Sequence, residues 1–170
     1  MNRNYKLETN LNYIHKQAVI REDENYRFRR YLKSQSADKI DKIVHRLHHE
    51  ITRRIDCTTC GNCCEKLAPN FSEEEVDYLA KIEKISSKDY IKKYCVVEDG
   101  DIYLKTEPCR YLKDKNCTIF ENMPIKCSTF PYTKKPNFTG RLYSMIEFYA
   151  ICPIVYNIME ILKDELRFRR

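Results

Sequence analysis

Four cysteines within eight residues constrain this chain more than any other feature of its sequence. They form the run Cys57-Thr-Thr-Cys60-Gly-Asn-Cys63-Cys64, and five further cysteines follow it. Thiolates are soft donors that suit zinc and iron–sulfur clusters, and a C-x2-C spacing lets one loop wrap one metal centre. The run therefore predicts a metal centre that is held by a loop.

The cysteine count and the N-terminus favour metal ligation over disulfide bonds. The chain has 170 residues and nine cysteines, an odd number, and it begins with a polar segment instead of an apolar signal sequence. No apolar stretch approaches the roughly 20 residues that span a bilayer. We therefore expect a cytoplasmic protein with no membrane partner, in a compartment where thiols stay reduced.

The glycines exclude two common classes of nucleotide-binding protein. Only Gly61, Gly100 and Gly140 are present, so neither G-x-G-x-x-G nor G-x-x-x-x-G-K-[ST] can occur. The radical S-adenosylmethionine spacing C-x3-C-x2-C is also missing, because Leu67 stands where its third cysteine would be.

Apolar spacing predicts a mainly α fold with one small β-hairpin. Apolar residues recur every three or four positions between the cap Ser36 and Ile55, and Ser72 with Glu75 forms a capping box before a helix to about Ile85. Other helices are expected at 22–33, at 88–94 after a Ser87 cap, as one turn near 120–126, and at 153–166. The hairpin is expected at 96–104 and a strand at 141–149. The cysteines fall between these elements, so helices would frame an irregular cysteine-rich metal-binding core.

Composition also suggests how the chain divides. Residues 1–35 show weak periodicity and predict a basic, polar N-terminal extension with a short helix after a loosely ordered lead. Residues 36–170 are expected to form a single cysteine-cluster metal-binding domain, because a chain of this length has room for one hydrophobic core.

Eight of the cysteines are candidate metal ligands, enough for two four-thiolate centres. They are Cys57, Cys60, Cys63, Cys64, Cys109, Cys117, Cys127 and Cys152. The first three repeat every three residues, as in bacterial ferredoxins, and Cys152 is a candidate fourth ligand for them. Cys64 would then serve a second centre with the remaining three. Cys95 stands apart and is expected to be a buried apolar residue.

The metal itself is left open between two candidates. The three-residue register favours iron–sulfur clusters, so [4Fe–4S] is the preferred cofactor and zinc is the alternative. Arg110 and Lys126 lie next to candidate ligands, where a positive charge could tune a cluster's potential.

Other polar patterns give weaker indications. The net charge is +6, and basic residues concentrate at 27–30, 53–54 and 167–170. Such clusters can bind nucleic acid, but solvated helix faces explain them better, so a nucleic-acid partner is not favoured. His45, His48 and His49 are expected on a solvated helix instead of at a metal. No Ser/His/Asp order or carboxylate pair marks a catalytic site, and the catalytic residues, if any, are unknown.

The cysteine motifs resemble the YkgJ-type CxxCxxCC family of zinc- or iron-chelating proteins, which is related to the cysteine domain of flagellin lysine N-methylases. The resemblance rests on the run Cys57–Cys64 and on the segments 108–112, 116–120 and 123–131, and it ends near Pro153. Phe120, Met123 and Ser128 stand where the family has Tyr, Arg and Arg.

The resemblance implies a metal centre more strongly than a reaction. The first hypothesis is an iron–sulfur protein that acts in redox or protein-modification chemistry with an unknown protein partner or protein substrate. The alternatives are a zinc-stabilised module that binds protein or nucleic acid, and a lysine-methylase-like enzyme.

Overall fold

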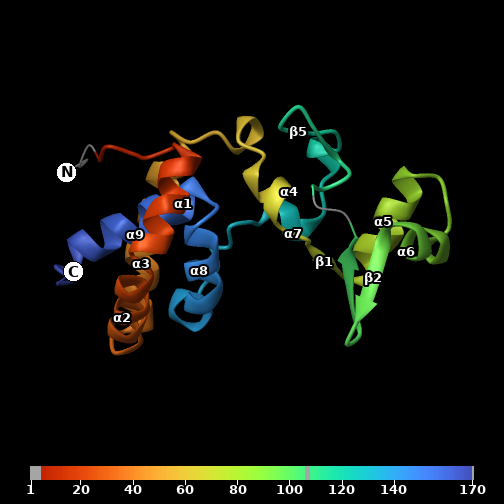
Figure 1. Ribbon diagram of the computed structural model, residues 1–170. Coiled ribbons are helices and arrows are strands. Elements are labelled where there is room, and N and C mark those ends of the chain that lie inside the picture. The colour runs from red at the N-terminus through yellow and green to blue at the C-terminus, as the bar shows by residue number, and fades with distance from the viewer. Residues whose placement is uncertain (1–4, 106–107, 170) are drawn as a thin grey trace. The chain divides into compact units, whose positions relative to one another are not determined.

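The computed structural model describes residues 5–105 and 108–169 (Figure 1). Residues 1–4 of the predicted extension and Arg170 of the basic terminus lie outside the described residues. Of the described residues, 59% lie in helices and 9% in strands, so the predicted mainly α fold is confirmed. The chain forms two compact units. Unit 1 combines the chain up to Asp56 with the chain from Pro131 onward, and unit 2 is Cys57–Phe130.

Unit 1 is built around one buried helix. Its elements are α1 (Leu11–Ile20), α2 (Glu22–Lys33), α3 (Ala37–Thr52), η3 (Phe138–Arg141), α8 (Leu142–Tyr149) and α9 (Pro153–Glu165). Helix α9 contacts α1, α3 and α8 (Figure 1). Its residues from Pro153 to Met159 are all buried, as expected of a helix that is apolar on every side.

Three predicted helices of unit 1 are confirmed. Ser36 caps α3 by accepting from the Lys39 N–H at 3.4 Å, and the predicted apolar stripe of this helix is buried. Helix α2 has the predicted bounds, and Pro153 occupies the first turn of α9.

Two predictions in unit 1 are wrong. The segment before residue 22 is not loosely ordered, because it contains α1. Its apolar residues do not mark one buried face, since Val19 and Ile20 are 67% and 63% exposed, so apolar spacing did not predict this helix. The segment 141–149 is not a strand but contains α8. Its buried residues Leu142, Met145 and Tyr149 are spaced three and four apart, which is a helical spacing.

Unit 2 packs short helices against a small sheet. Its elements are η1 (Cys57–Thr59), α4 (Asn62–Lys66), β1 (Asn70–Phe71), α5 (Glu73–Ile82), α6 (Ser87–Tyr94), β2 (Cys95–Glu98), β3 (Asp101–Leu104), β4 (Leu112–Lys113), β5 (Asn116–Cys117), η2 (Phe120–Asn122) and α7 (Ile125–Ser128). The antiparallel strands β1, β3 and β2 form one sheet in that order, and β4 pairs with β5 in a second ribbon. Phe71, Val76, Leu79, Tyr90 and Leu104 belong to the hydrophobic core between the sheet and its helices.

Local signals in unit 2 match the structure closely. The predicted hairpin is confirmed as β2 and β3, with Asp99 and Gly100 at positive φ as a two-residue turn requires. The capping box of Ser72 and Glu75 is also confirmed. Helix α6 is capped by Ser86 and not by Ser87, so the predicted cap was one residue late.

The division of the chain into an extension up to residue 35 and one metal-binding domain stays a prediction. In the part of the chain that the structure describes, no helix has the length and apolar character needed to cross a membrane.

Candidate metal centre

The cysteine run forms a tight loop that only glycine can close. Gly61 has φ +62° and separates η1 from α4. A Cβ atom at Gly61 would lie 2.7 Å from the Lys115 carbonyl oxygen and 3.2 Å from the Leu112 side chain. The loop therefore packs directly on the β4–β5 ribbon, where Cys117 pairs with Leu112.

Cys63 and Cys64 begin α4, and their thiols face each other. Their Sγ atoms are 3.9 Å apart. The interaction with Cys63 lowers the pKa of Cys64 to about 7. For comparison, sulfur atoms bound tetrahedrally at about 2.3 Å from zinc lie about 3.8 Å apart.

Backbone contacts bring distant cysteines to this loop. The Cys109 N–H donates to the Cys64 carbonyl at 2.7 Å. Cys117 lies in β5, which contacts η1. Cys127 lies in α7, and its N–H donates to the Pro124 carbonyl at 2.9 Å. All three thiols are half-buried beside the hydrophobic core of unit 2.

The electrostatics show that four of these thiols share one neighbourhood. Burial, together with the charges of Cys109, Cys64 and Cys117, raises the pKa of Cys127 to about 12. Burial is also the main cause that raises the pKa of Cys109 and of Cys117, and both respond to Cys64. A bound cation would reverse this preference for neutral thiols, because metal ligation requires thiolates.

The helix that carries Cys127 is anchored by polar contacts. The Lys126 N–H donates to Glu75 Oε1 at 3.0 Å, and Lys126 Nζ donates to Asn70 Oδ1 at 2.8 Å. Glu75 therefore both caps α5 and supports α7.

Arg110 also has a structural role beside its cysteine. Its Nη1 lies 2.9 Å from Glu83 Oε1, and its guanidinium covers the Tyr94 ring at 3.6 Å. The predicted tuning of a cluster by Arg110 or Lys126 stays a prediction.

The remaining cysteines occupy different settings. Cys57 is exposed and Cys60 is half-buried in the same loop as Cys63. Cys152 belongs to unit 1, where it is buried at the N-cap of α9. Cys95 is 4% exposed in the core of unit 2, as expected of an apolar residue, and burial raises its pKa.

The donor set fits a thiophilic metal chemically, but the thiols are not arranged around a single point. Within residues 5–105 and 108–169, no group of three or more His, Cys, Asp or Glu side chains is placed to hold a metal ion. The structure thus brings Cys64, Cys109, Cys117 and Cys127 into one region without defining coordination.

The histidines of α3 lie in unit 1. His48 Nδ1 is 2.8 Å from Thr133 Oγ1. Burial lowers the pKa of His48, and the neighbouring charges of Lys134, His45 and His49 lower it further.

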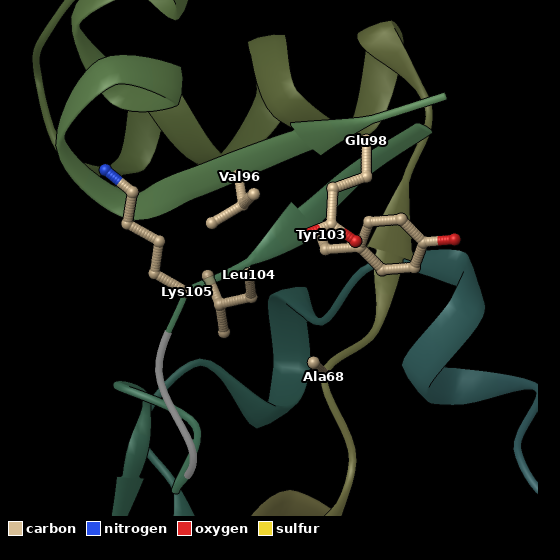
Figure 2. Close-up of a pocket in the computed structure, with 6 residues that line it drawn as sticks. All are labelled: Ala68, Val96, Glu98, Tyr103, Leu104 and Lys105. Carbon is tan, nitrogen blue, oxygen red and sulfur yellow. The ribbon is translucent and has the colours of Figure 1, made fainter. Parts of the chain in front are cut away.

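A hollow of about 490 Å³ lies along β2 and β3 in unit 2 (Figure 2). Its lining consists of Ala68, Val96, Glu98, Tyr103, Leu104 and Lys105. Val96 and Tyr103 are cross-strand partners of β2 and β3, and Lys105 Nζ is engaged with the Lys92 carbonyl at 2.8 Å. This lining contains no thiol, so the hollow is separate from the candidate metal centre.

Comparison with known proteins identifies the cysteine pattern. Residues 56–147 match the family model named CxxCxxCC, described as a "putative zinc- or iron-chelating domain". The match covers more than half of the chain. The protein belongs to the CxxCxxCC family. No curated protein and no solved structure matches this CxxCxxCC chain.

Sequence reasoning missed two residues that build the centre of this CxxCxxCC protein. In the sequence, Gly61 serves only to exclude nucleotide-binding motifs, whereas in the structure Gly61 lets the loop approach Lys115. Glu75 was assigned only to a capping box, although it also holds α7. The glycine inside the cysteine run was a usable signal for the first, whereas no local pattern reveals the second.

Proposed function

We propose that this protein binds metal through two four-thiolate centres, with [4Fe–4S] clusters favoured over zinc. The eight ligands would be the eight cysteines other than Cys95. Family membership supports zinc or iron chelation, and the iron–sulfur assignment is our own step beyond it.

The observation that carries the proposal is the convergence of Cys64, Cys109, Cys117 and Cys127 in unit 2. A direct backbone hydrogen bond joins Cys64 to Cys109, and Gly61 lets the loop pack against the ribbon of Cys117. Four thiols that influence one another's pKa supply the count that one tetrahedral ion or one cubane requires.

The second centre would use Cys57, Cys60 and Cys63, with Cys152 as the fourth ligand. The support is the three-residue register of the first three cysteines, which is typical of [4Fe–4S] binding. Such centres transfer electrons or support modification of a protein substrate in a reducing compartment, so we propose a cytoplasmic protein that works with a protein partner.

Zinc is the second candidate, because one distance favours it. The Cys63 and Cys64 thiols are 3.9 Å apart, close to the sulfur–sulfur distance of a tetrahedral zinc site. A shared zinc ion would place both thiols in one centre.

Metal analysis of anaerobically purified protein tests the proposal. Two [4Fe–4S] clusters predict a brown protein with about eight iron atoms and about eight sulfides per chain. A colourless protein with about two zinc ions would support the zinc module instead and contradict the iron–sulfur assignment.

Cysteine variants test which thiols bind. Cys109→Ser should lose about half of the bound metal, whereas the matched control Cys95→Ala should keep all of it. Retention of full metal content by Cys109→Ser would contradict its role as a ligand.

The assignment of Cys63 and Cys64 to separate centres needs a pair of variants. Each single serine variant should lose about half of the metal, and the double variant should lose nearly all of it. If the double variant loses no more than each single variant, the two thiols serve the same centre.

A further inference from the structure

The tetrapeptide Arg-Phe-Arg-Arg occurs twice in the chain, at 27–30 in α2 and at 167–170 after α9. Aromatic contacts within unit 1 bring the two copies together. The Phe168 ring lies 4.9 Å from the Phe28 ring and 5.5 Å from the Tyr31 ring, measured between centroids. Segments far apart in sequence thus meet through their phenylalanines.

The second copy is held in place by the way α9 ends. The Arg167 N–H donates to the Asp164 carbonyl at 3.1 Å, and the Phe168 N–H donates to the Lys163 carbonyl at 2.9 Å. This pattern is a Schellman motif, which turns the chain back and directs Phe168 onto α2. Arg167 has φ +51°, the left-handed conformation that glycine adopts at least cost. An arginine at this position costs backbone strain that a glycine would avoid, which is consistent with a functional role for its positive charge.

The arginines around this contact lack carboxylate partners. Arg27, Arg30, Arg167 and Arg169 are exposed, and among the described residues none of them forms an ion pair.

The carboxylates near these arginines are largely engaged elsewhere. Glu24 and Glu160 bind Lys163, and Glu165 binds Arg46. Asp23 lies one turn before Arg27 on α2, and Asp164 lies three residues before Arg167, so two carboxylates stand against four arginines. The group therefore retains an excess of positive charge.

The charge of the chain is divided unequally between the units. Residues 1–56 and 131–170 contain 20 Lys and Arg against 12 Asp and Glu, whereas residues 57–130 contain 11 against 13. Unit 1 thus carries the whole basic excess, and unit 2 is slightly acidic. A polyanion would be attracted to this unit and not to the cysteine-bearing one.

We propose that Arg27, Arg30, Arg167 and Arg169 form a surface that binds the phosphate backbone of a single-stranded nucleic acid. Tyr26 is 39% exposed one turn before Arg30, where its ring offers a face on which a base can stack. An anionic membrane is a poorer fit, because the apolar residues Phe28 and Leu32 of α2 are fully buried and leave no face to insert. This activity does not depend on the identity of the metal.

The test measures binding of a fluorescent 20-nucleotide single-stranded DNA to the full-length, metal-loaded protein over a range of salt concentrations. Four neutralised phosphates predict a slope of about −3 for log K against log salt, or a loss of about 50-fold in affinity between 50 and 200 mM salt. The variant with Arg27, Arg30 and Arg169 each changed to Gln should have a slope of about −1.

Two controls separate the proposal from a general charge effect or a folding defect. Replacing Lys81, Lys88 and Lys92 by Gln removes the same charge from exposed positions of unit 2 and should leave the slope unchanged. Arg167→Gly should reduce the slope by about one while it raises the thermal midpoint, because it removes strain and charge together.

Three results would overturn the proposal. They are an unchanged slope in the triple arginine variant, an equal loss in the lysine control, and binding to anionic phosphatidylserine vesicles without binding to the oligonucleotide.

Discussion

Lys163 offers the sharpest test of how unit 1 is stabilised. Its side chain is fully buried, and Nζ lies 2.7 Å from Glu24 Oε1, from Asn25 Oδ1 and from Glu160 Oε1. A buried ammonium is tolerated only when its hydrogen bonds are satisfied, and here all three are. Lys163→Met keeps the length and the apolar stem of the side chain but removes the charge.

The expected cost follows from the partners that remain. Removing one member of a buried ion pair costs about 3 to 5 kcal/mol, because a carboxylate is left without compensation. Glu160 keeps Arg21 and the Tyr149 hydroxyl, which donates to it at 3.0 Å. Among the described residues Glu24 forms an ion pair with Lys163 alone, although the charge of Arg21 still acts on it, so we expect about 3 kcal/mol, near the lower end of the range.

Urea unfolding followed by circular dichroism measures this loss. With a slope of about 2 kcal/mol per molar urea, the midpoint should fall by about 1.5 M at an unchanged slope. Adding Glu24→Gln should restore part of the loss, because the uncompensated carboxylate is removed as well. A midpoint that falls by less than about 0.5 M would refute the reasoning. A double variant that loses more stability than the sum of the two single losses would also refute it.

Three further predictions concern backbone strain and pH. Gly61→Ala should destabilise the protein by about 2 to 4 kcal/mol in thermal melts and lower its metal content, because φ is +62° and the new Cβ would meet the Lys115 carbonyl. The matched control Gly100→Ala has open space around the new Cβ, so it should cost only about 1 kcal/mol in the same melts. Arg167→Gly should add about 0.5 to 1 kcal/mol, since relief of the left-handed strain exceeds the entropy of glycine, and a lower melting temperature would contradict this. The pKa of His48 is lowered in the folded state, so the unfolded state takes up the proton first and stability should fall as pH drops below about 6.5, with no effect above it. In a plot of the urea midpoint against pH, His48→Gln should reduce the fall below about pH 6.5. An identical plot for both proteins would rule out His48 as its cause.

Local patterns predicted most of the fold because most elements carry their own signals. The Ser36 cap and the capping box of Ser72 each depend on a few neighbouring residues. The Asp99-Gly100 turn depends only on the positive φ of its own two residues. The misread strand at 141–149 shows the limit of this approach. Its aromatic residues suit a strand, but burial against α9 selects the helical spacing of Leu142, Met145 and Tyr149.

The chemistry of the site was readable from the sequence for a different reason. Clustered cysteines at metal-ligand spacing predict chelation, and family membership agrees with zinc or iron chelation, whereas the individual ligands stay a prediction. The supports of the site were not readable. Glu75 acts on Lys126 across the unit, and Gly61 acts on Lys115, which are contacts that no window of neighbouring residues contains.

The division of thiols between two centres depends on both kinds of information. Register along the chain groups Cys63 with Cys57 and Cys60, whereas tertiary contacts group Cys64 with Cys109. The two groupings meet in the first turn of α4, where the thiols are 3.9 Å apart. Two centres built on one helical turn cannot be independent, because the turn that positions one ligand positions the other. We therefore expect loss of metal from either centre to weaken binding at its neighbour. The metal that the Cys63→Ser and Cys64→Ser variants retain should then be removed by a chelator at a lower concentration than metal in the unchanged protein, and equal resistance to the chelator would contradict this coupling.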